Sequence, residues 1–128
     1  MTFDKIKTHT ELAAISKSAR ERGKIVGFTN GCFDVLHIGH IRYLAEAKKN
    51  CDILIVGVNS DDSVKRLKGP KRPLNVETAR AEVIAALGAV DYVTIFGDDT
   101  PLEIIRIILP QVLFKGGDWD EESVVGGD

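Results

Sequence analysis

Short runs of apolar, mostly β-branched residues alternate along the chain with longer stretches in which apolar residues recur every three or four positions. The short runs are typical of buried strands, and the longer stretches are typical of helices. Repeated strand, helix, strand units form a parallel sheet with right-handed crossovers, so the pattern predicts an α/β fold. The strands are predicted at residues 25–29, 53–58, 91–96 and 112–115, and the helices between them at 40–49, 61–67, 76–87 and 101–109.

Capping and turn residues indicate where further elements begin and end. A helix before the first strand is predicted between Thr10, as its cap, and Gly23, which marks its end. Thr100 is predicted to cap the last helix, and Pro101 after it is a strong start signal because proline fits the first helical position. Residues 68–75 are rich in Lys, Arg, Gly and Pro, and we expect them to form a long loop.

Length, charge and hydropathy limit the class of protein. With 128 residues, the chain is predicted to form one domain, residues 1–128, in which residues 1–23 lead into the sheet. The net charge of −2 provides no bulk basic field for nucleic acid, and no apolar run is long enough to cross a bilayer. The N-terminus lacks the apolar segment of a secretory signal. We therefore expect a cytoplasmic protein that binds neither nucleic acid nor membranes.

The two cysteines are predicted to remain thiols. Cys32 follows the first strand and Cys51 precedes the second, which places them at opposite ends of a parallel sheet, and the cytosol is reducing. The same separation argues against a structural zinc site that would use both cysteines. A catalytic zinc ion held by Asp34, His37 and His40 stays open as an alternative.

Two histidines flank a glycine directly after the first predicted strand. His37, Gly39 and His40 lie where that strand gives way to a helix, and ligands bind at this edge of open α/β sheets. The amides and the positive dipole end of the helix favour phosphate oxygens there. Residues three apart on a first turn face the same way, and Gly39 leaves room for a phosphate to approach. The motif therefore predicts a nucleotide phosphate site in which both imidazoles donate hydrogen bonds.

Other polar residues also follow strands. Asn59 and Asp61 come after the second strand, and Lys115 to Trp119 come after the last. Because the carboxyl ends of parallel strands meet at one edge, we expect these motifs to share a site with the histidines. Between them lies a basic run that is either solvated surface or a clamp for a triphosphate. Its members are Lys65, Arg66, Lys68, Lys71 and Arg72.

The segment Gly31-Cys32-Phe33-Asp34, followed by His37-Ile38-Gly39-His40, resembles the signature of the HxGH nucleotidyltransferases. Three further motifs look like those of the adenylyltransferase domain of bacterial ADP-heptose synthases, and the glycerol-3-phosphate cytidylyltransferases are the nearest relatives by motif. The resemblance extends over about residues 24–127 and implies a Rossmann-like, three-layer α/β/α fold with a parallel sheet. The three motifs are Asn59-Ser60-Asp61, residues 68–73 and residues 113–119.

The resemblance implies a role for most polar residues at this edge. The catalytic residues that it implies are His37, His40, Lys68 and Arg80. The nucleotide-binding residues are Thr29, Asn30, Gly31, Cys32, Phe33, Asp34, Gly39, Lys115, Gly117, Asp118 and Trp119. The substrate-binding residues are Asn59, Asp61 and Arg72. No residue is predicted to bind a metal ion, and Mg²⁺ is implied as the companion of ATP.

Three of these residues have competing interpretations. Arg80 either binds the substrate or polyphosphate, or is an exposed arginine on its helix. Asp34 is placed to hold the glycine turn, to orient a histidine or to help with a metal ion, and the resemblance does not decide among these roles. Trp119 either contacts the ribose or base, or packs in the core near the chain end.

The implied reaction transfers AMP from ATP to heptose 1-phosphate, giving ADP-heptose and pyrophosphate for the lipopolysaccharide core or a related glycan. No protein nucleophile is needed, since positioning and charge stabilisation suffice for phosphoryl-type transfer. The expected partners are ATP, the sugar 1-phosphate, a second copy of the chain in a homodimer and a separate sugar kinase. Family members continue with a further strand and a Ser-Thr-Thr segment, so we expect that this chain lacks the family's C-terminal tail.

Two alternative functions remain. One is a cytidylyltransferase that acts on glycerol 3-phosphate or a similar alcohol phosphate, and the other is a non-catalytic nucleotide-binding module, which the short C-terminus favours. A dinucleotide-dependent oxidoreductase is disfavoured because no G-x-G-x-x-G motif follows the first strand.

Overall fold

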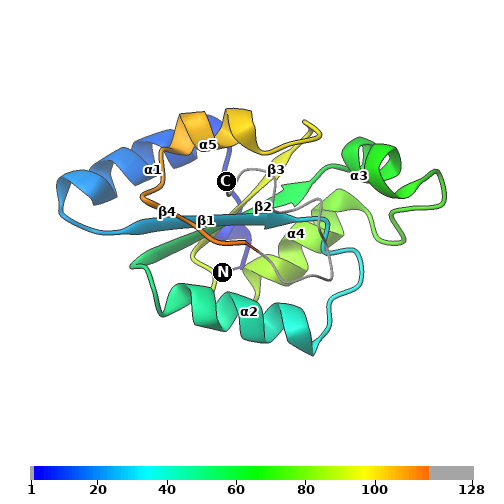
Figure 1. The fold of residues 1–128 in the computed structure, drawn as a ribbon, viewed down its shortest axis with the longest axis horizontal. Coiled ribbons are helices and arrows are strands. Elements are labelled where there is room, and N and C mark those ends of the chain that lie inside the picture. Colours follow the sequence, from blue (N-terminus) through cyan, green and yellow to red (C-terminus); the bar gives the residue numbers. More distant parts are fainter. Residues whose placement is uncertain (1, 116–128) are drawn as a thin grey trace.

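A parallel four-stranded sheet forms the centre of the protein in a computed structural model, which describes residues 2–115 (Figure 1). All three pairings between neighbouring strands are parallel. The predicted α/β class with one parallel sheet is therefore confirmed. The strands, in the spatial order β3-β2-β1-β4, are β1 (Val26–Gly31), β2 (Ile53–Asn59), β3 (Tyr92–Phe96) and β4 (Val112–Leu113).

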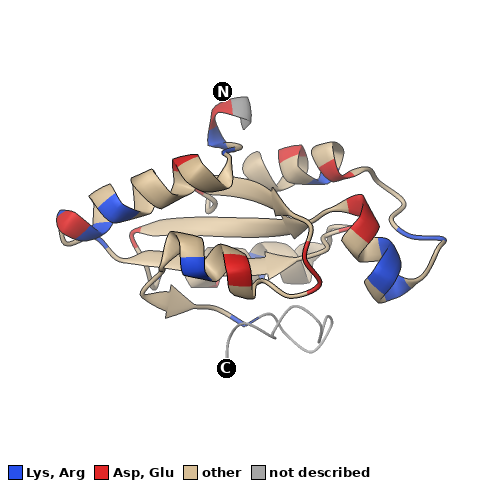
Figure 2. Cartoon of the chain, turned by 90° about the horizontal axis from the view of Figure 1, so that it is seen from above, with Lys and Arg blue, Asp and Glu red and all other residues tan. Residues whose placement is uncertain are grey.

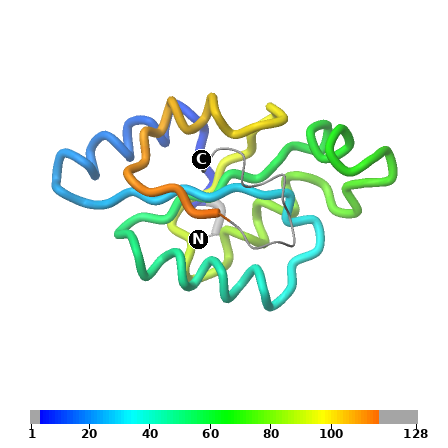
Figure 3. Tube along the Cα trace, viewed as in Figure 1, coloured from blue at the N-terminus to red at the C-terminus, as the bar shows by residue number. Residues whose placement is uncertain are grey.

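Helices cover both faces of this sheet and make three layers (Figures 1 and 3). On one face lie α1 (His9–Glu21) and α5 (Leu102–Ile108), and on the other lie α2 (Ile38–Lys48) and α4 (Glu77–Ala85). The helix α3 (Asp61–Lys68) lies beyond the carboxyl end of β2, and a short 3₁₀ turn, η1 (Thr2–Lys5), precedes α1. The expected three-layer, Rossmann-like arrangement is thus confirmed. Within residues 2–115, no helix has the length and apolar character needed to cross a membrane.

The strand β2 shows how one apolar run supports two cores. Successive side chains of a strand point to opposite faces, so Leu54 and Val56 pack beneath α2 and α4 with Leu44. Ile55 lies on the other face, in the cluster that contains Leu12 of α1. Because both faces are covered, every position of β2 after Ile53 is buried, as expected for a central strand of a parallel sheet.

Two helix caps differ from the expectation. Thr8, rather than Thr10, caps α1: its hydroxyl accepts from the Glu11 amide at 3.1 Å, and the Glu11 carboxylate accepts from the Thr8 amide at 2.9 Å. This reciprocal capping box satisfies two amides at once, which a cap at Thr10 would not. In α5, Pro101 itself occupies the cap position and its carbonyl accepts the first helical hydrogen bond, so the prediction that Thr100 caps this helix is wrong.

The strand order reverses direction at β1. The chain moves from β1 through α2 to β2 on one side, and from β3 through α5 to β4 on the other side of β1. The two connections cover opposite faces of the sheet (Figure 1), and ligands of open α/β sheets bind at such a switch point. The strand β4 is shorter than predicted, and Lys115 lies two residues beyond its end.

Both cysteines are present as thiols, as expected. Cys32 directly follows β1, whereas Cys51 lies beside Gly27 at the start of that strand, where a β-carbon on Gly27 would come within 2.9 Å of the Cys51 Sγ atom.

Candidate active site

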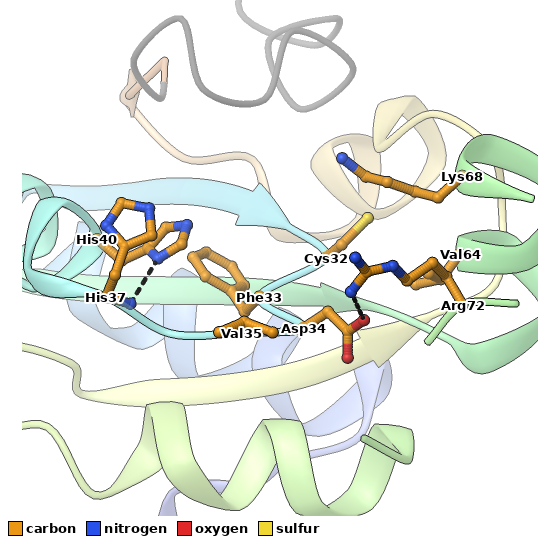
Figure 4. Close-up of a pocket in the computed structure, with 9 residues that line it drawn as sticks. All are labelled: Cys32, Phe33, Asp34, Val35, His37, His40, Val64, Lys68 and Arg72. Carbon is orange, nitrogen blue, oxygen red and sulfur yellow. Dashed lines mark hydrogen bonds and ion pairs between the residues drawn. The ribbon is translucent and has the colours of Figure 1, made fainter. Parts of the chain in front are cut away.

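A cavity of about 340 Å³ opens at the carboxyl end of β1 (Figure 4). The two histidines of the HxGH motif lie on one side of it, and Lys68 and Arg72 lie on the other. The loop that follows β1 lies between them. This volume is in the range of small-molecule sites in proteins. The lining residues are Cys32, Phe33, Asp34, Val35, His37, His40, Val64, Lys68 and Arg72.

Phe33 shapes the loop between β1 and α2. Its φ of 49° lies in the left-handed region, which is uncommon for a residue other than glycine, and its ring is buried. The ring folds back on Gly31, where a β-carbon would lie 2.9 Å from it. It also meets the His40 ring edge to face, with the ring centroids 5.5 Å apart. The turn after β1 therefore provides an apolar support for His40.

Hydrogen bonds to the main chain orient both histidines. His37 caps α2, and its Nδ1 accepts from the Gly39 amide at 3.0 Å. The His40 Nδ1 accepts from the His37 amide at 3.2 Å. In a neutral imidazole, a ring nitrogen that accepts leaves the proton on the other nitrogen, so Nε2 is the donor in each ring. With ring centroids 4.1 Å apart, the two imidazoles are close enough to bind one anion together.

Gly39 is required by this arrangement. A β-carbon there would lie 2.7 Å from the Cε1 atom of His37 and would push that ring out of its capping position. Because His37 is the cap, α2 begins at Ile38, two residues earlier than predicted, and His40 falls within the first turn.

Burial, with a smaller effect of the neighbouring His37, lowers the pKa of His40 to about 4. This imidazole is therefore neutral at neutral pH and acts on an anion as a hydrogen-bond donor rather than as a full positive charge. The positive charge at the cavity belongs to Lys68 and Arg72 on the opposite side.

Arg80 is almost fully buried, with 2% of its surface exposed, and its guanidinium is bound by the protein itself. It donates to the carbonyl oxygens of Cys32 and Asn59 at 2.7 Å each and of Asn75 at 2.9 Å, and to Asp61 Oδ1 at 2.8 Å. The alternative of an exposed helix arginine is wrong. A buried guanidinium is stable only when it is paired, so these bonds hold Arg80 between the ends of β1 and β2 and the segment at Asn75. The phosphate contact expected for Arg80 stays a prediction.

The basic run does not act as one unit. Figure 2 shows acidic residues at the start of α3 and basic residues at its end and in the following loop. Arg66 is turned toward the loop after β3, where it pairs with Asp99 and donates to the Gly97 carbonyl. Lys68 and Arg72 line the cavity. The remaining two cations, Lys65 and Lys71, are exposed.

The sequence comparison fits this geometry. The family model described as cytidylyltransferase-like matches residues 28–124. The chain belongs to the cytidylyltransferase-like family. The resemblance of its HxGH motif to the nucleotidyltransferases is thereby confirmed.

Several relatives of this family member are longer proteins. This chain is 56% identical over 127 residues to the bifunctional protein HldE of Nitratiruptor sp., and the matched region covers 99% of this chain and 28% of the relative. The chain is 57% identical over 121 residues to the bifunctional protein HldE of Sulfurimonas denitrificans, and this match covers 94% of the chain and 25% of the relative. The chain therefore spans about a quarter of the length of these curated relatives.

A solved structure supports the fold assignment. The lipopolysaccharide core biosynthesis protein from Thermoplasma volcanium GSS1 is 34% identical in sequence and superimposes with a TM-score of 0.64. The match covers 71% of this chain and 73% of that protein.

The remaining predicted site residues fall into four groups. Thr29 and Asn30 are buried within β1, and the Thr29 hydroxyl lies 2.7 Å from the Tyr43 hydroxyl. Asn59 and Asp61 meet Arg80 rather than the cavity. Lys115 is exposed after β4. The predictions for Gly117, Asp118 and Trp119 concern positions outside the described residues.

Four residues at or beside the cavity were not expected from the sequence. Val35 and Val64 line it with apolar surface, and Leu74 and Asn75 donate main-chain hydrogen bonds to Asp34. None carries a recognisable signal, because valine is common in cores and a main-chain amide is common to nearly every residue.

The cavity is better suited to a phosphate than to a metal ion. Within residues 2–115, no group of three or more His, Cys, Asp or Glu side chains is arranged to hold a metal. Asp34, one ligand of the zinc alternative, accepts from two main-chain amides and from Arg72. The groups that face one another across the cavity are hydrogen-bond donors or cations.

The lowered pKa of His40 has a measurable consequence. We expect its imidazole to titrate near pH 4 in an NMR experiment on this cytidylyltransferase-like protein. The unfolded chain takes up the proton near its ordinary pKa of 6.5, so the free energy of unfolding should fall as the pH drops from 6.5 to about 4. His40→Asn should remove that part of the pH dependence. An imidazole that titrates near 6.5 in the folded protein would contradict the buried, neutral assignment.

Proposed function

We propose that this chain transfers AMP from ATP to heptose 1-phosphate, giving ADP-heptose and pyrophosphate. The observation that carries the proposal is the pair of Nε2 donors of His37 and His40 at the start of α2. These donors lie across the cavity from Lys68 and Arg72. Preorganised donors that face cations across a small cavity suit a polyphosphate. The names of the HldE relatives and of the solved lipopolysaccharide protein support the choice of acceptor.

In the proposed mechanism, a phosphate oxygen of the sugar 1-phosphate attacks the α-phosphorus of ATP. The bond from that phosphorus to the oxygen bridging the α- and β-phosphates breaks, and pyrophosphate leaves with the electron pair. His37 and His40 donate hydrogen bonds to oxygens of the α–β region, where negative charge grows. Lys68 and Arg72 hold the outer phosphates as charges, and the protein's part is positioning and electrostatics.

Mg²⁺ is proposed to enter with ATP as part of the substrate. Most of the polar side chains that line the described cavity are donors or cations, and the carboxylate of Asp34 is already bound by amides and by Arg72. They therefore fit the phosphates rather than the ion. When bound, Mg²⁺ neutralises part of the triphosphate charge.

A cytoplasmic homodimer is also part of the proposal. Val76 and Val83, with 58% and 50% of their surface exposed, lie with the exposed Ala79 on the outward side of α4. Apolar surface on a helix side that faces away from the sheet suits a second copy of the chain. A sugar kinase activity has to supply the heptose 1-phosphate.

The second candidate is a cytidylyltransferase that acts on glycerol 3-phosphate, which the name of the matching family favours. A pyrophosphate-release assay with ATP or CTP, each combined with heptose 1-phosphate or glycerol 3-phosphate, separates the candidates. We expect the highest kcat/KM with ATP and heptose 1-phosphate. A preference for CTP and glycerol 3-phosphate would move the chain to the second candidate. Nucleotide binding without turnover of any pair would indicate a non-catalytic module.

The two histidines should be required for turnover. His37→Ala and His40→Ala should each lower kcat by about a hundredfold or more, because each removes a preorganised donor to the developing charge. His9→Ala provides the matched control, since His9 lies on α1 and contacts the Ile95 carbonyl. Near-native kcat in both folded cavity variants would rule out the proposed phosphate contacts.

A further inference from the structure

We propose that Asp34 is a positioning residue that fixes the basic segment 68–75 opposite the histidines, so that Lys68 and Arg72 are in place before the nucleotide enters. This inference rests on the proposed function. In this proposal, Asp34 does not make the direct nucleotide contact that was expected for it. Its role also differs from the three that the sequence left open, which were to hold the glycine turn, to orient a histidine or to help with a metal ion.

The Asp34 carboxylate receives several hydrogen bonds from one short stretch of chain. The Leu74 amide donates to its two oxygens at 2.9 and 2.8 Å, and the Asn75 amide donates to Oδ1 at 2.9 Å. Arg72 Nη1 lies 3.2 Å from Oδ2. In the reverse direction, the Asn75 side chain donates to the Asp34 carbonyl at 2.7 Å. Asp34 thus joins the loop after β1 to the basic segment, although the two are separated by about forty positions in the chain.

The charge state of Asp34 argues against a direct phosphate contact. Burial alone would raise the pKa of this carboxyl, but the amides of Leu74 and Asn75 and the Arg72 guanidinium outweigh it and lower the pKa below its ordinary value. An ionised carboxylate only accepts hydrogen bonds, so it has no donor for a phosphate oxygen and repels it by charge. A residue of this kind beside a polyphosphate acts by holding donors in place.

The basic segment has little regular structure of its own. It contains Gly69, with a φ of 104°, together with Pro70 and Pro73, which cannot donate main-chain hydrogen bonds. Its ties to the sheet edge include the bonds to Asp34 and the bond from Arg80 to the Asn75 carbonyl. The carboxylate therefore contributes strongly to the position of the segment.

Arg72 is able to serve both Asp34 and a phosphate. Its side chain is 45% exposed, whereas that of Asp34 is 12% exposed, so the guanidinium reaches from the partly buried carboxylate toward the open side of the cavity. A guanidinium has five N–H donors in a fixed plane, and the contact with Asp34 uses Nη1. Phosphate binding then needs no exchange of partners, and the ion pair orients the donors in advance.

The test combines amide hydrogen exchange without nucleotide and calorimetric titration with MgATP. In Asp34→Asn, exchange at Leu74 and Asn75 should become faster, because their charged acceptor is lost. We expect the basic segment of the variant to be correctly placed only about a tenth of the time, which should raise the Kd for MgATP about tenfold. Asp62→Asn is the matched control: it removes the same charge from an exposed position on α3 and should leave both measurements unchanged.

A double-mutant cycle distinguishes positioning from direct contact. If Asp34 acts by holding the segment that carries Arg72, Asp34→Asn should weaken MgATP binding by less than about threefold in an Arg72→Gln background. The same tenfold loss in both backgrounds, unchanged exchange at Leu74 and Asn75, or an unchanged Kd would each overturn the proposal. If the wild-type protein does not bind MgATP, the proposed function is wrong. The exchange rates at Leu74 and Asn75 then still test whether Asp34 fixes the basic segment.

Should Asp34→Asn not fold, Asn75→Ala carries the test. This variant removes the side-chain donor to the Asp34 carbonyl and leaves the carboxylate in place. Faster exchange at Leu74 with weaker MgATP binding would support the proposal, and native values for both would overturn it.

Discussion

The buried guanidinium of Arg80 is the interaction on which the candidate site depends. A positive charge inside a protein is stable only when its donors are paired, and the four acceptors of Arg80 come from three separate parts of the chain. They include the ends of β1 and β2 at Cys32 and Asn59, and the first turn of α3 at Asp61. Arg80 thereby fixes the edge of the sheet, the helix that carries Lys68 and the segment that follows it.

On this fixed edge, the structure separates hydrogen-bond donation from charge. His37 and His40 are oriented by main-chain amides, and burial keeps His40 neutral, so the imidazoles provide directed N–H groups. Lys68 and Arg72 provide the charge from the opposite side. A neutral donor close to the reacting phosphate and cations farther along the polyphosphate suit a reaction in which negative charge moves toward the leaving group.

Local patterns predicted the fold better than they predicted the site. The apolar run of β2 and the HxGH motif are continuous in sequence, so the sheet and the cavity histidines were expected. The burial of Arg80 was not expected, because it depends on main-chain carbonyls of distant residues, which carry no sequence signal. The role of Asp34 was undecided for the same reason, since its partners are amides about forty positions away. The start of α1 was missed although Thr8 and Glu11 form a recognisable capping box.

A crystal structure with Mg²⁺ and a non-hydrolysable ATP analogue tests the central claim most directly. We predict phosphate oxygens of the α–β region within about 3 Å of the Nε2 atoms of His37 and His40, the usual hydrogen-bond distance. The outer phosphates should contact Lys68 and Arg72, while Arg80 keeps its protein acceptors. Phosphates bound away from the histidines, or an Arg80 side chain turned from the Cys32 and Asn59 carbonyls toward the nucleotide, would contradict the account.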